Sequence, residues 1–219
     1  MGNYSIDKRA ERELGFFLDK YFYQRLKEKY GYDGFKRVRK KEEQIQGVDV
    51  VGFIKGRECV IDEKASLRYM DKDLKTFSFE LSFMRNGEEF VGWFLDNRMK
   101  TQYYVLMYPK SRKDIRDITS EDFDSVEILV VPVHRIWEYL NGKGLTKESL
   151  KKRAEEIRGK GRTGRMPTGK NIDGVYISAT GKERLEEAPI NLIIRKGILA
   201  EIASGHFLVT REKIMVRKK

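Results

Sequence analysis

Two aspartates and a lysine stand close together in two short apolar segments of the chain. Asp49 belongs to the segment 48–54, and Asp62 and Lys64 belong to the segment 59–65. Neighbouring carboxylates in apolar surroundings repel each other and resist the loss of water, so such a pair favours a raised pKa or a bound cation. The spacing therefore predicts a polar site made of two acids and one lysine.

The residue types in this group suit a hard divalent cation. Mg²⁺ prefers a few carboxylate oxygens and keeps several waters, and we expect Mn²⁺ to substitute for it. Asp49 and Asp62 are the predicted ligands, with the carbonyl oxygen of Glu63 as a third. An ammonium group beside the ion can orient an attacking water or stabilise charge developing on a phosphate, which is the role expected of Lys64.

A β-hairpin is the element that would position these groups. Residues 55–57, Lys-Gly-Arg, form a turn signal between the two apolar segments. Because strand side chains alternate between faces, Asp62 and Lys64 should share one face and Glu63 should point inward from the other. The short turn would bring Asp49 close to Asp62.

Residues 5–30 are predicted to form one long amphipathic helix, with Ser5 as a candidate N-cap. Apolar residues recur along it at helical spacing: Ala10, Leu14, Phe17, Leu18, Tyr21 and Phe22. Glu11 falls within this stripe and Glu13 at its opposite edge. A glutamate in a core-facing stripe needs a partner, which would be the metal site or, as the alternative, a nearby arginine. We expect Glu11 to serve as a further catalytic and metal-binding acid, while the choice between Glu11 and Glu13 stays open.

These residues resemble the PD-(D/E)XK nuclease superfamily, in which an acid on one strand is followed by (D/E)-x-K on the next. The pattern here is Asp49 and then Asp62-Glu63-Lys64, with Val48 in place of the proline. The run Ala-Glu-Arg-Glu-Leu at 10–14 is similar to the first helix of archaeal Holliday-junction resolvases, where it supplies another acid. The likeness covers about the first third of the chain. It implies a restriction-endonuclease-like fold and a Mg²⁺-dependent DNA endonuclease.

The composition agrees with a polyanionic partner. The chain has 219 residues, a formal net charge of +11 and a pI near 9.5, which favours attraction to DNA. Its single cysteine, Cys59, excludes an internal disulfide and a cysteine-based zinc cluster and is typical of a reducing compartment. No apolar leader or membrane-length apolar run is apparent. We therefore expect a soluble cytoplasmic protein that binds DNA and no membrane, and paired cuts would favour a homodimer.

The remaining sequence predicts an α/β fold with a mixed central sheet flanked by helices. The expected strands are 35–41, 102–108, 126–133, 173–178 and 190–194, and the expected helices are 71–84, 135–140, 145–157 and 198–203. Residues 1–141 would form the nuclease core. Residues 142–219 would form a basic α+β extension that packs on the core and contacts DNA.

A glycine-rich basic loop spans residues 158–170. It has four glycines, no acid and five basic residues: Arg158, Lys160, Arg162, Arg165 and Lys170. Such a loop can approach a phosphate backbone closely, so these five residues are the predicted DNA contacts. The alternative is a solvated loop without a ligand.

Three functions remain open from the sequence. The length of residues 110–219 favours an endonuclease with its own target choice, of the restriction or phage type. The first helix favours a structure-specific repair or recombination nuclease. The third function is a DNA-binding module that keeps the site without cleaving.

Overall fold

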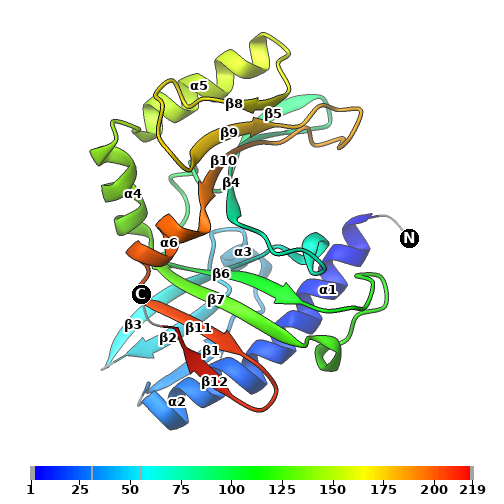
Figure 1. Ribbon diagram of the computed structural model, residues 1–219, viewed down its shortest axis with the longest axis vertical. Coiled ribbons are helices and arrows are strands. Elements are labelled where there is room, and N and C mark those ends of the chain that lie inside the picture. The colour runs from blue at the N-terminus through cyan, green and yellow to red at the C-terminus, as the bar shows by residue number, and fades with distance from the viewer. Residues whose placement is uncertain (1–2, 31, 55, 218–219) are drawn as a thin grey trace. The chain divides into compact units, whose positions relative to one another are not determined.

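The computed structural model describes residues 3–30, 32–54 and 56–217 (Figure 1). It shows a mixed α/β protein with two separate sheets, each belonging to one of two compact units. Unit 1 consists of Met1–Leu74, Lys100–Val133 and Ala200–Lys219. Unit 2 consists of Lys75–Met99 and His134–Leu199.

Unit 1 is organised around a seven-stranded sheet with the order β1-β2-β3-β6-β7-β11-β12. Its strands are β1 (Gly34–Arg37), β2 (Val50–Ile54), β3 (Arg57–Ala65), β6 (Tyr103–Lys110), β7 (Ser125–Pro132), β11 (Gly205–Val209) and β12 (Ile214–Val216). The pairing of β3 with β6 is parallel, whereas each of the other neighbouring pairs is antiparallel. The sheet is therefore mixed, as predicted.

A long helix packs on this sheet. It consists of α1 (Asn3–Leu18), the π-helical turn η1 (Asp19–Tyr23) and α2 (Gln24–Tyr30). The predicted apolar stripe is buried in a single core with residues of β2, β3, β6, β7 and β11. The predicted helix over 5–30 is thus confirmed, although it begins at Asn3 and not after Ser5. The π turn inserts one residue into the helical repeat, and Tyr21, Phe22 and Tyr23 are all buried there.

Short helices complete unit 1. They are α3 (Lys41–Gln44) and the 3-10 turns η2 (Leu67–Tyr69) and η3 (Ser120–Asp122). The edge strand β1 ends at Arg37 and is shorter than the strand expected over 35–41, whose last residue, Lys41, begins α3.

Unit 2 contains a five-stranded antiparallel sheet with the order β5-β4-β10-β9-β8. Its strands are β4 (Thr76–Arg85), β5 (Glu88–Val91), β8 (Gly164–Met166), β9 (Val175–Ala179) and β10 (Ile190–Arg195). The helices in this part of the chain are α4 (Val133–Gly142), α5 (Lys147–Gly159) and α6 (Lys196–Ile202). α5 corresponds to the helix expected over 145–157. Thr146 is its N-cap and accepts a hydrogen bond from the Ser149 N–H at 3.1 Å.

The predicted helix over 71–84 is wrong, because most of this segment forms β4. Phe77, Phe79 and Leu81 are buried on one side of the strand, while Ser78 between them is exposed. Apolar residues at 77, 81 and 84 fit a helical repeat, but the alternation of apolar and polar residues from 76 onward has the period of two that a strand requires. Antiparallel pairing with β10 on one side and β5 on the other satisfies its main chain.

Sheet pairing joins segments that are far apart in the sequence. β11 pairs with β7 in unit 1, and β10 pairs with β4 in unit 2. For this reason the two units differ from the expected division at residue 141. The other expected strands and helices are present, with ends shifted by a few residues.

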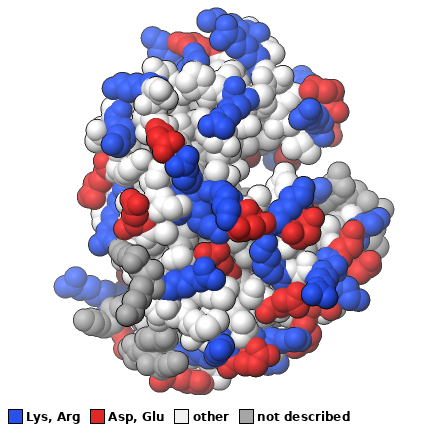
Figure 2. All heavy atoms as spheres, viewed as in Figure 1, with Lys and Arg blue, Asp and Glu red and all other residues white. Residues whose placement is uncertain are grey.

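No helix in the described part of the chain has the length and apolar character needed to cross a bilayer. On the face drawn in Figure 2, lysine and arginine side chains are interspersed with acidic ones.

Candidate active site

The predicted hairpin forms and places Asp49 beside β3. β2 pairs antiparallel with β3 along its whole length, and Lys55 in the connecting turn lies outside the described residues. Asp49 immediately precedes β2. Its N–H donates to the Ile61 carbonyl at 2.9 Å, and its carbonyl accepts from the Val38 N–H at 2.8 Å. Main-chain hydrogen bonds to β3 and to the residue that follows β1 therefore fix the Asp49 backbone.

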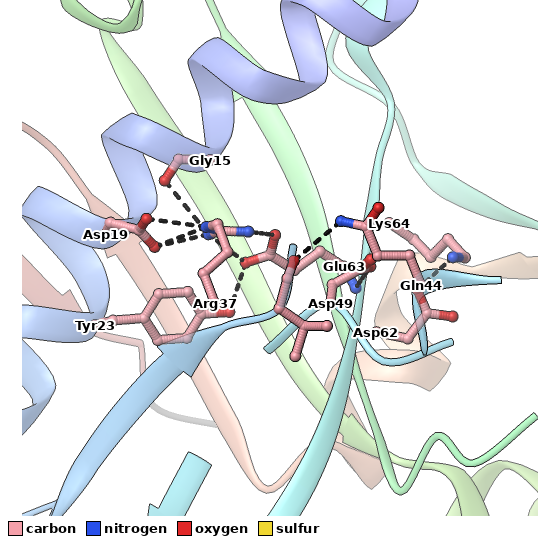
Figure 3. Close-up of polar contacts among 10 residues, drawn as sticks. Gly15, Asp19, Tyr23, Arg37, Gln44, Asp49, Asp62, Glu63 and Lys64 are labelled. Carbon is pink, nitrogen blue, oxygen red and sulfur yellow. Dashed lines mark hydrogen bonds and ion pairs between the residues drawn. The ribbon is translucent and has the colours of Figure 1, made fainter. Parts of the chain in front are cut away.

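The carboxyl groups of Asp49 and Asp62 meet at this point, as the spacing predicted (Figure 3). Asp62 is only 1% exposed. Asp49 Oδ2 also accepts a hydrogen bond from the Glu63 main-chain N–H at 2.9 Å. Burial, followed by the charge of Asp62, raises the pKa of Asp49 to about 6. This pair of acids therefore favours a proton or a cation between its oxygens.

Lys64 completes the group from the same strand as Asp62. Its Nζ donates a hydrogen bond to Asp62 Oδ1, with which it forms an ion pair. Burial alone would lower the pKa of Lys64, but the carboxylates of Asp62 and Asp49 outweigh it and raise this pKa above its usual value. Lys64 is therefore an ammonium group at neutral pH. It can donate hydrogen bonds and stabilise negative charge, but it cannot act as a base.

The side chain of Glu63 lies on the opposite face of β3, as predicted. Its carboxylate accepts hydrogen bonds from the Tyr23 hydroxyl at 2.7 Å and from Arg37 Nη1 at 2.6 Å. Because the N–H and C=O of one strand residue point to the same side, the Glu63 carbonyl faces Asp49 together with its N–H. The Glu63 carbonyl oxygen, and not its carboxylate, thus remains the predicted ligand.

The prediction that Glu11 lies in the core-facing stripe is wrong. Its side chain is 51% exposed and pairs with Lys8 at 2.7 Å. Leu18, seven positions later and within about 20° on the helix, is fully buried, so the angular position alone does not determine the burial of Glu11. The charge of Glu11 nevertheless contributes to the raised pKa of Lys64, so the two groups lie within electrostatic reach of each other.

Glu13 faces elsewhere. Its side chain is 17% exposed, and Oε2 accepts a hydrogen bond from the Ser120 N–H at 3.1 Å. Of the two helix glutamates, Glu11 is therefore the one whose charge reaches the lysine of the site.

Across the described residues, no three His, Cys, Asp or Glu side chains are grouped so that they could hold a metal ion. The expected oxygen donors at the site are the carboxylates of Asp49 and Asp62, with the main-chain carbonyl of Glu63 as the predicted third donor. Such a set suits a cation that keeps most of its waters, as Mg²⁺ does. Burial and the charge of Asp62 raise the pKa of Asp49 although the nearby Lys64 ammonium opposes the shift.

Tyr104 is a neighbour of the site that the sequence did not assign to it. It stands opposite Asp62 in the parallel register of β3 and β6 and is 3% exposed. Burial, followed by the charge of Asp62, raises the pKa of Tyr104 well above its usual value, so it stays a neutral phenol. Its place depends on the register between two strands far apart in sequence, which hydrophobic patterning does not reveal.

The five basic residues of the segment 158–170 have different environments. Arg158 turns inward and donates to the Ala188 carbonyl at 2.7 Å and to Ser82 Oγ at 2.9 Å, and it pairs with Glu89 at 3.2 Å. These partners all lie in unit 2, so Arg158 stabilises that unit.

The other four basic residues are exposed: Lys160, Arg162, Arg165 and Lys170. The guanidinium of Arg165 lies over the Tyr176 ring, 3.9 Å from its centroid. These four side chains remain the predicted DNA contacts.

The raised pKa of Asp49 predicts a specific dependence of stability on pH. In the unfolded chain Asp49 titrates near 3.8, whereas in the folded protein it keeps its proton up to about pH 6. The folded state therefore binds the extra proton, and the contribution of Asp49 to stability is complete below its unfolded pKa and is lost as the pH rises through about 6.

Urea unfolding of the wild type and of Asp49→Asn, in parallel at several pH values and without divalent cations, measures this effect. The wild type should lose stability relative to Asp49→Asn as the pH rises through this window. A difference between the two proteins that does not change with pH would contradict the assignment.

Comparison with protein-family models, curated proteins and solved structures gave no match. The geometry of the site therefore carries the functional argument by itself.

Proposed function

We propose that this protein is a Mg²⁺-dependent DNA endonuclease with a PD-(D/E)XK-type site on a restriction-endonuclease-like core in unit 1. The observation that carries the proposal is the buried contact of Asp49 with Asp62, with the Lys64 ammonium on Asp62. A long helix, an antiparallel hairpin and a strand parallel to its second arm support this core. The second helix expected over 71–84 is not part of this support, because most of that segment forms β4 in unit 2. The resemblance in sequence supports the same proposal.

The chain's own groups have distinct tasks in this mechanism. Asp49, Asp62 and the Glu63 carbonyl would hold Mg²⁺, and Glu11 would act on a water or a second ion from the margin of the site. When bound, the metal supplies positive charge that stabilises the phosphodiester transition state. Lys64 orients the attacking water and donates to the developing charge. The water oxygen would attack phosphorus in line with the 3′ oxygen, so that a new P–O bond forms as the P–O3′ bond breaks. The water would lose its proton to solvent and the leaving 3′ oxygen would take one from solvent, which leaves a 5′ phosphate and a 3′ hydroxyl.

Binding of the DNA backbone is assigned to the exposed basic residues of unit 2. Exposed Lys and Arg side chains gain affinity by releasing counterions from phosphates, without reading sequence. Thr168, a buried residue of the segment 158–170, donates its hydroxyl to the Lys170 carbonyl at 3.1 Å and so orders the end of that segment.

Incubation with supercoiled plasmid, linear duplex and four-way junction DNA tests this function, in Mg²⁺, in Mn²⁺ and with a chelator as control. Discrete fragments would indicate an endonuclease with a target sequence. Cleavage confined to junctions would favour the second candidate, a structure-specific nuclease, which the Ala-Glu-Arg-Glu-Leu run of α1 supports. Binding without cleavage of any substrate would leave the non-cleaving DNA-binding module.

The different environments of Arg158 and Arg162 predict different effects on DNA binding. Arg162→Ala should weaken binding to all duplexes alike and reduce the slope of log affinity against log salt by about 1, the effect of one phosphate contact. Fluorescence anisotropy over a salt series measures this slope.

Arg158→Ala is the matched variant for that experiment. It removes an arginine from the same segment but should lower thermal stability, because it leaves the Ala188 carbonyl and Ser82 without their donor. A salt slope reduced by Arg158→Ala and unchanged by Arg162→Ala would contradict these assignments.

A further inference from the structure

A network of four side chains lies on the face of β3 opposite the two aspartates (Figure 3). Arg37 is at its centre. It donates to Glu63 at 2.6 Å and 3.2 Å and to Asp19 at 2.7 Å, 2.9 Å and 3.1 Å. Tyr23 donates its hydroxyl to Glu63 Oε1 at 2.7 Å. The Glu63 side chain is 11% exposed, and these donors satisfy both of its oxygens.

This network connects three elements of unit 1. Arg37 is the last residue of the edge strand β1, Glu63 lies within β3, and Asp19 and Tyr23 are the first and last residues of the π turn η1. π turns are rare and occur often at functional sites, because they change the direction of side chains along a helix. Here the turn carries both helix side chains that contact the Arg37 and Glu63 pair, and the Gly15 carbonyl in α1 accepts a further hydrogen bond from Arg37 at 3.4 Å.

Glu63 links the network to the acids of the site. At the start of β2, the carboxylate of Asp49 accepts a hydrogen bond from the Glu63 N–H at 2.9 Å. A rotation of the β3 backbone at Glu63 would therefore move the donor that orients the Asp49 oxygens. On the other face of β3, three donor atoms hold the carboxylate of the same residue, Glu63.

We propose that Tyr23, Arg37 and Asp19 are positioning residues for the active site, and that they hold the Glu63 main chain in the orientation that aligns the Asp49 carboxylate. This inference rests on the proposed nuclease function. None of the three touches the reacting groups. Their effect passes through one peptide unit, so it should appear in the catalytic rate and in the protection of the Glu63 N–H.

Tyr23→Phe tests the inference with little disturbance, because it removes only the hydroxyl. Tyr21→Phe is its control: Tyr21 lies in the same π turn and is buried, but its hydroxyl contacts Glu121, at 3.3 Å and 3.4 Å. Two quantities are measured for each protein. One is kcat and KM for plasmid cleavage in Mn²⁺, and the other is the rate of hydrogen exchange at the Glu63 amide by NMR without metal.

Tyr23→Phe should lower kcat about 10-fold, as loss of an outer partner of a metal ligand does, and leave KM for DNA unchanged. Exchange at the Glu63 amide should be about 5-fold faster, the factor that corresponds to one net hydrogen bond. Tyr21→Phe should leave both quantities at their wild-type values. Wild-type kcat and exchange in Tyr23→Phe, or equal losses in the two variants, would overturn the inference.

Arg37→Lys provides a second variant. Lysine keeps the charge but lacks the planar fork that bridges Glu63 and Asp19, so kcat should fall about 100-fold while the protein remains folded by circular dichroism. A wild-type rate in folded Arg37→Lys would overturn the inference. If the wild type itself cleaves no DNA, the proposed function fails, and unchanged Glu63 exchange in Tyr23→Phe would separately show that the positioning claim fails.

Discussion

Asp62→Asn is expected to lower DNA cleavage about 1,000-fold or more, the largest single effect that the site predicts. Asp62 is almost completely buried, contacts Asp49 and accepts from Lys64. Asparagine keeps the shape of this side chain and removes its charge. The proposed metal ion would lose an anionic ligand, and Lys64 would lose the counterion that holds its ammonium at the site.

Single-turnover cleavage of a labelled duplex in Mn²⁺ measures this loss. Asp114→Asn is the matched control, because Asp114 also belongs to unit 1 and pairs with an arginine, Arg116, at 2.8 Å on the surface. It should cleave at the wild-type rate. The fold of Asp62→Asn should persist, since Asp49 remains beside Lys64 to compensate its charge. A rate for Asp62→Asn within 10-fold of the wild type would contradict the assignment.

Arg37→Met is expected to lower the free energy of unfolding by about 3 to 5 kcal/mol, the usual cost of removing one partner from a buried ion pair. Glu63 would be left in the interior without a positive partner. Burial already raises the pKa of Glu63, even though Arg37 opposes this shift. Urea unfolding at neutral pH measures the loss.

Adding Glu63→Gln to Arg37→Met should restore part of that stability, because the second change removes the uncompensated charge. Arg116→Met is the matched single variant. The Arg116 and Asp114 side chains are 69% and 49% exposed, so their ion pair should contribute less than about 1 kcal/mol. Equal losses in Arg37→Met and Arg116→Met, or a double variant less stable than Arg37→Met, would show that the network is not a buried charge pair.

The local features of the site could be predicted from the sequence. The turn signal at 55–57 and the apolar residues around it predicted the hairpin. The alternation of strand side chains predicted that Glu63 lies on one face of the strand and Asp62 and Lys64 on the other. The periodicity of residues 5–30 gave the helix and most of its buried face. These features depend on neighbours in the chain, so short-range patterns determine them.

What could not be predicted depends on pairing across long separations. The prediction of a helix over 71–84 is wrong because most of this segment forms β4. That strand is stabilised by pairing with β10, more than one hundred residues later in the sequence. In the sequence nothing distinguishes Arg37 from the other basic residues around it. Its role depends on the fold, which places it between Asp19 and Glu63. The interior role of Arg158 likewise depends on partners from two other strands or loops of unit 2.

Glu11 shows the limit of periodicity within a single helix. Its angular position places it within the apolar stripe, although its side chain is 51% exposed in the structure. In the structure its closest partner is Lys8, one turn earlier. The sequence therefore predicted correctly that Glu11 lies near the site, because its charge acts on Lys64, but predicted wrongly that its side chain is buried.

Plasmid cleavage by the wild type and by Lys64→Ala, side by side in Mg²⁺ and Mn²⁺, tests the central claim most directly. Lys20→Ala is the control, because Lys20 is an exposed lysine of the same unit that pairs with Glu121. The geometry predicts that the wild type and Lys20→Ala convert supercoiled plasmid to nicked or linear product, that a chelator stops them, and that Lys64→Ala leaves the plasmid intact. Cleavage by Lys64→Ala at the wild-type rate, or cleavage that persists in the chelator, would contradict a metal-dependent site built on Asp49, Asp62 and Lys64.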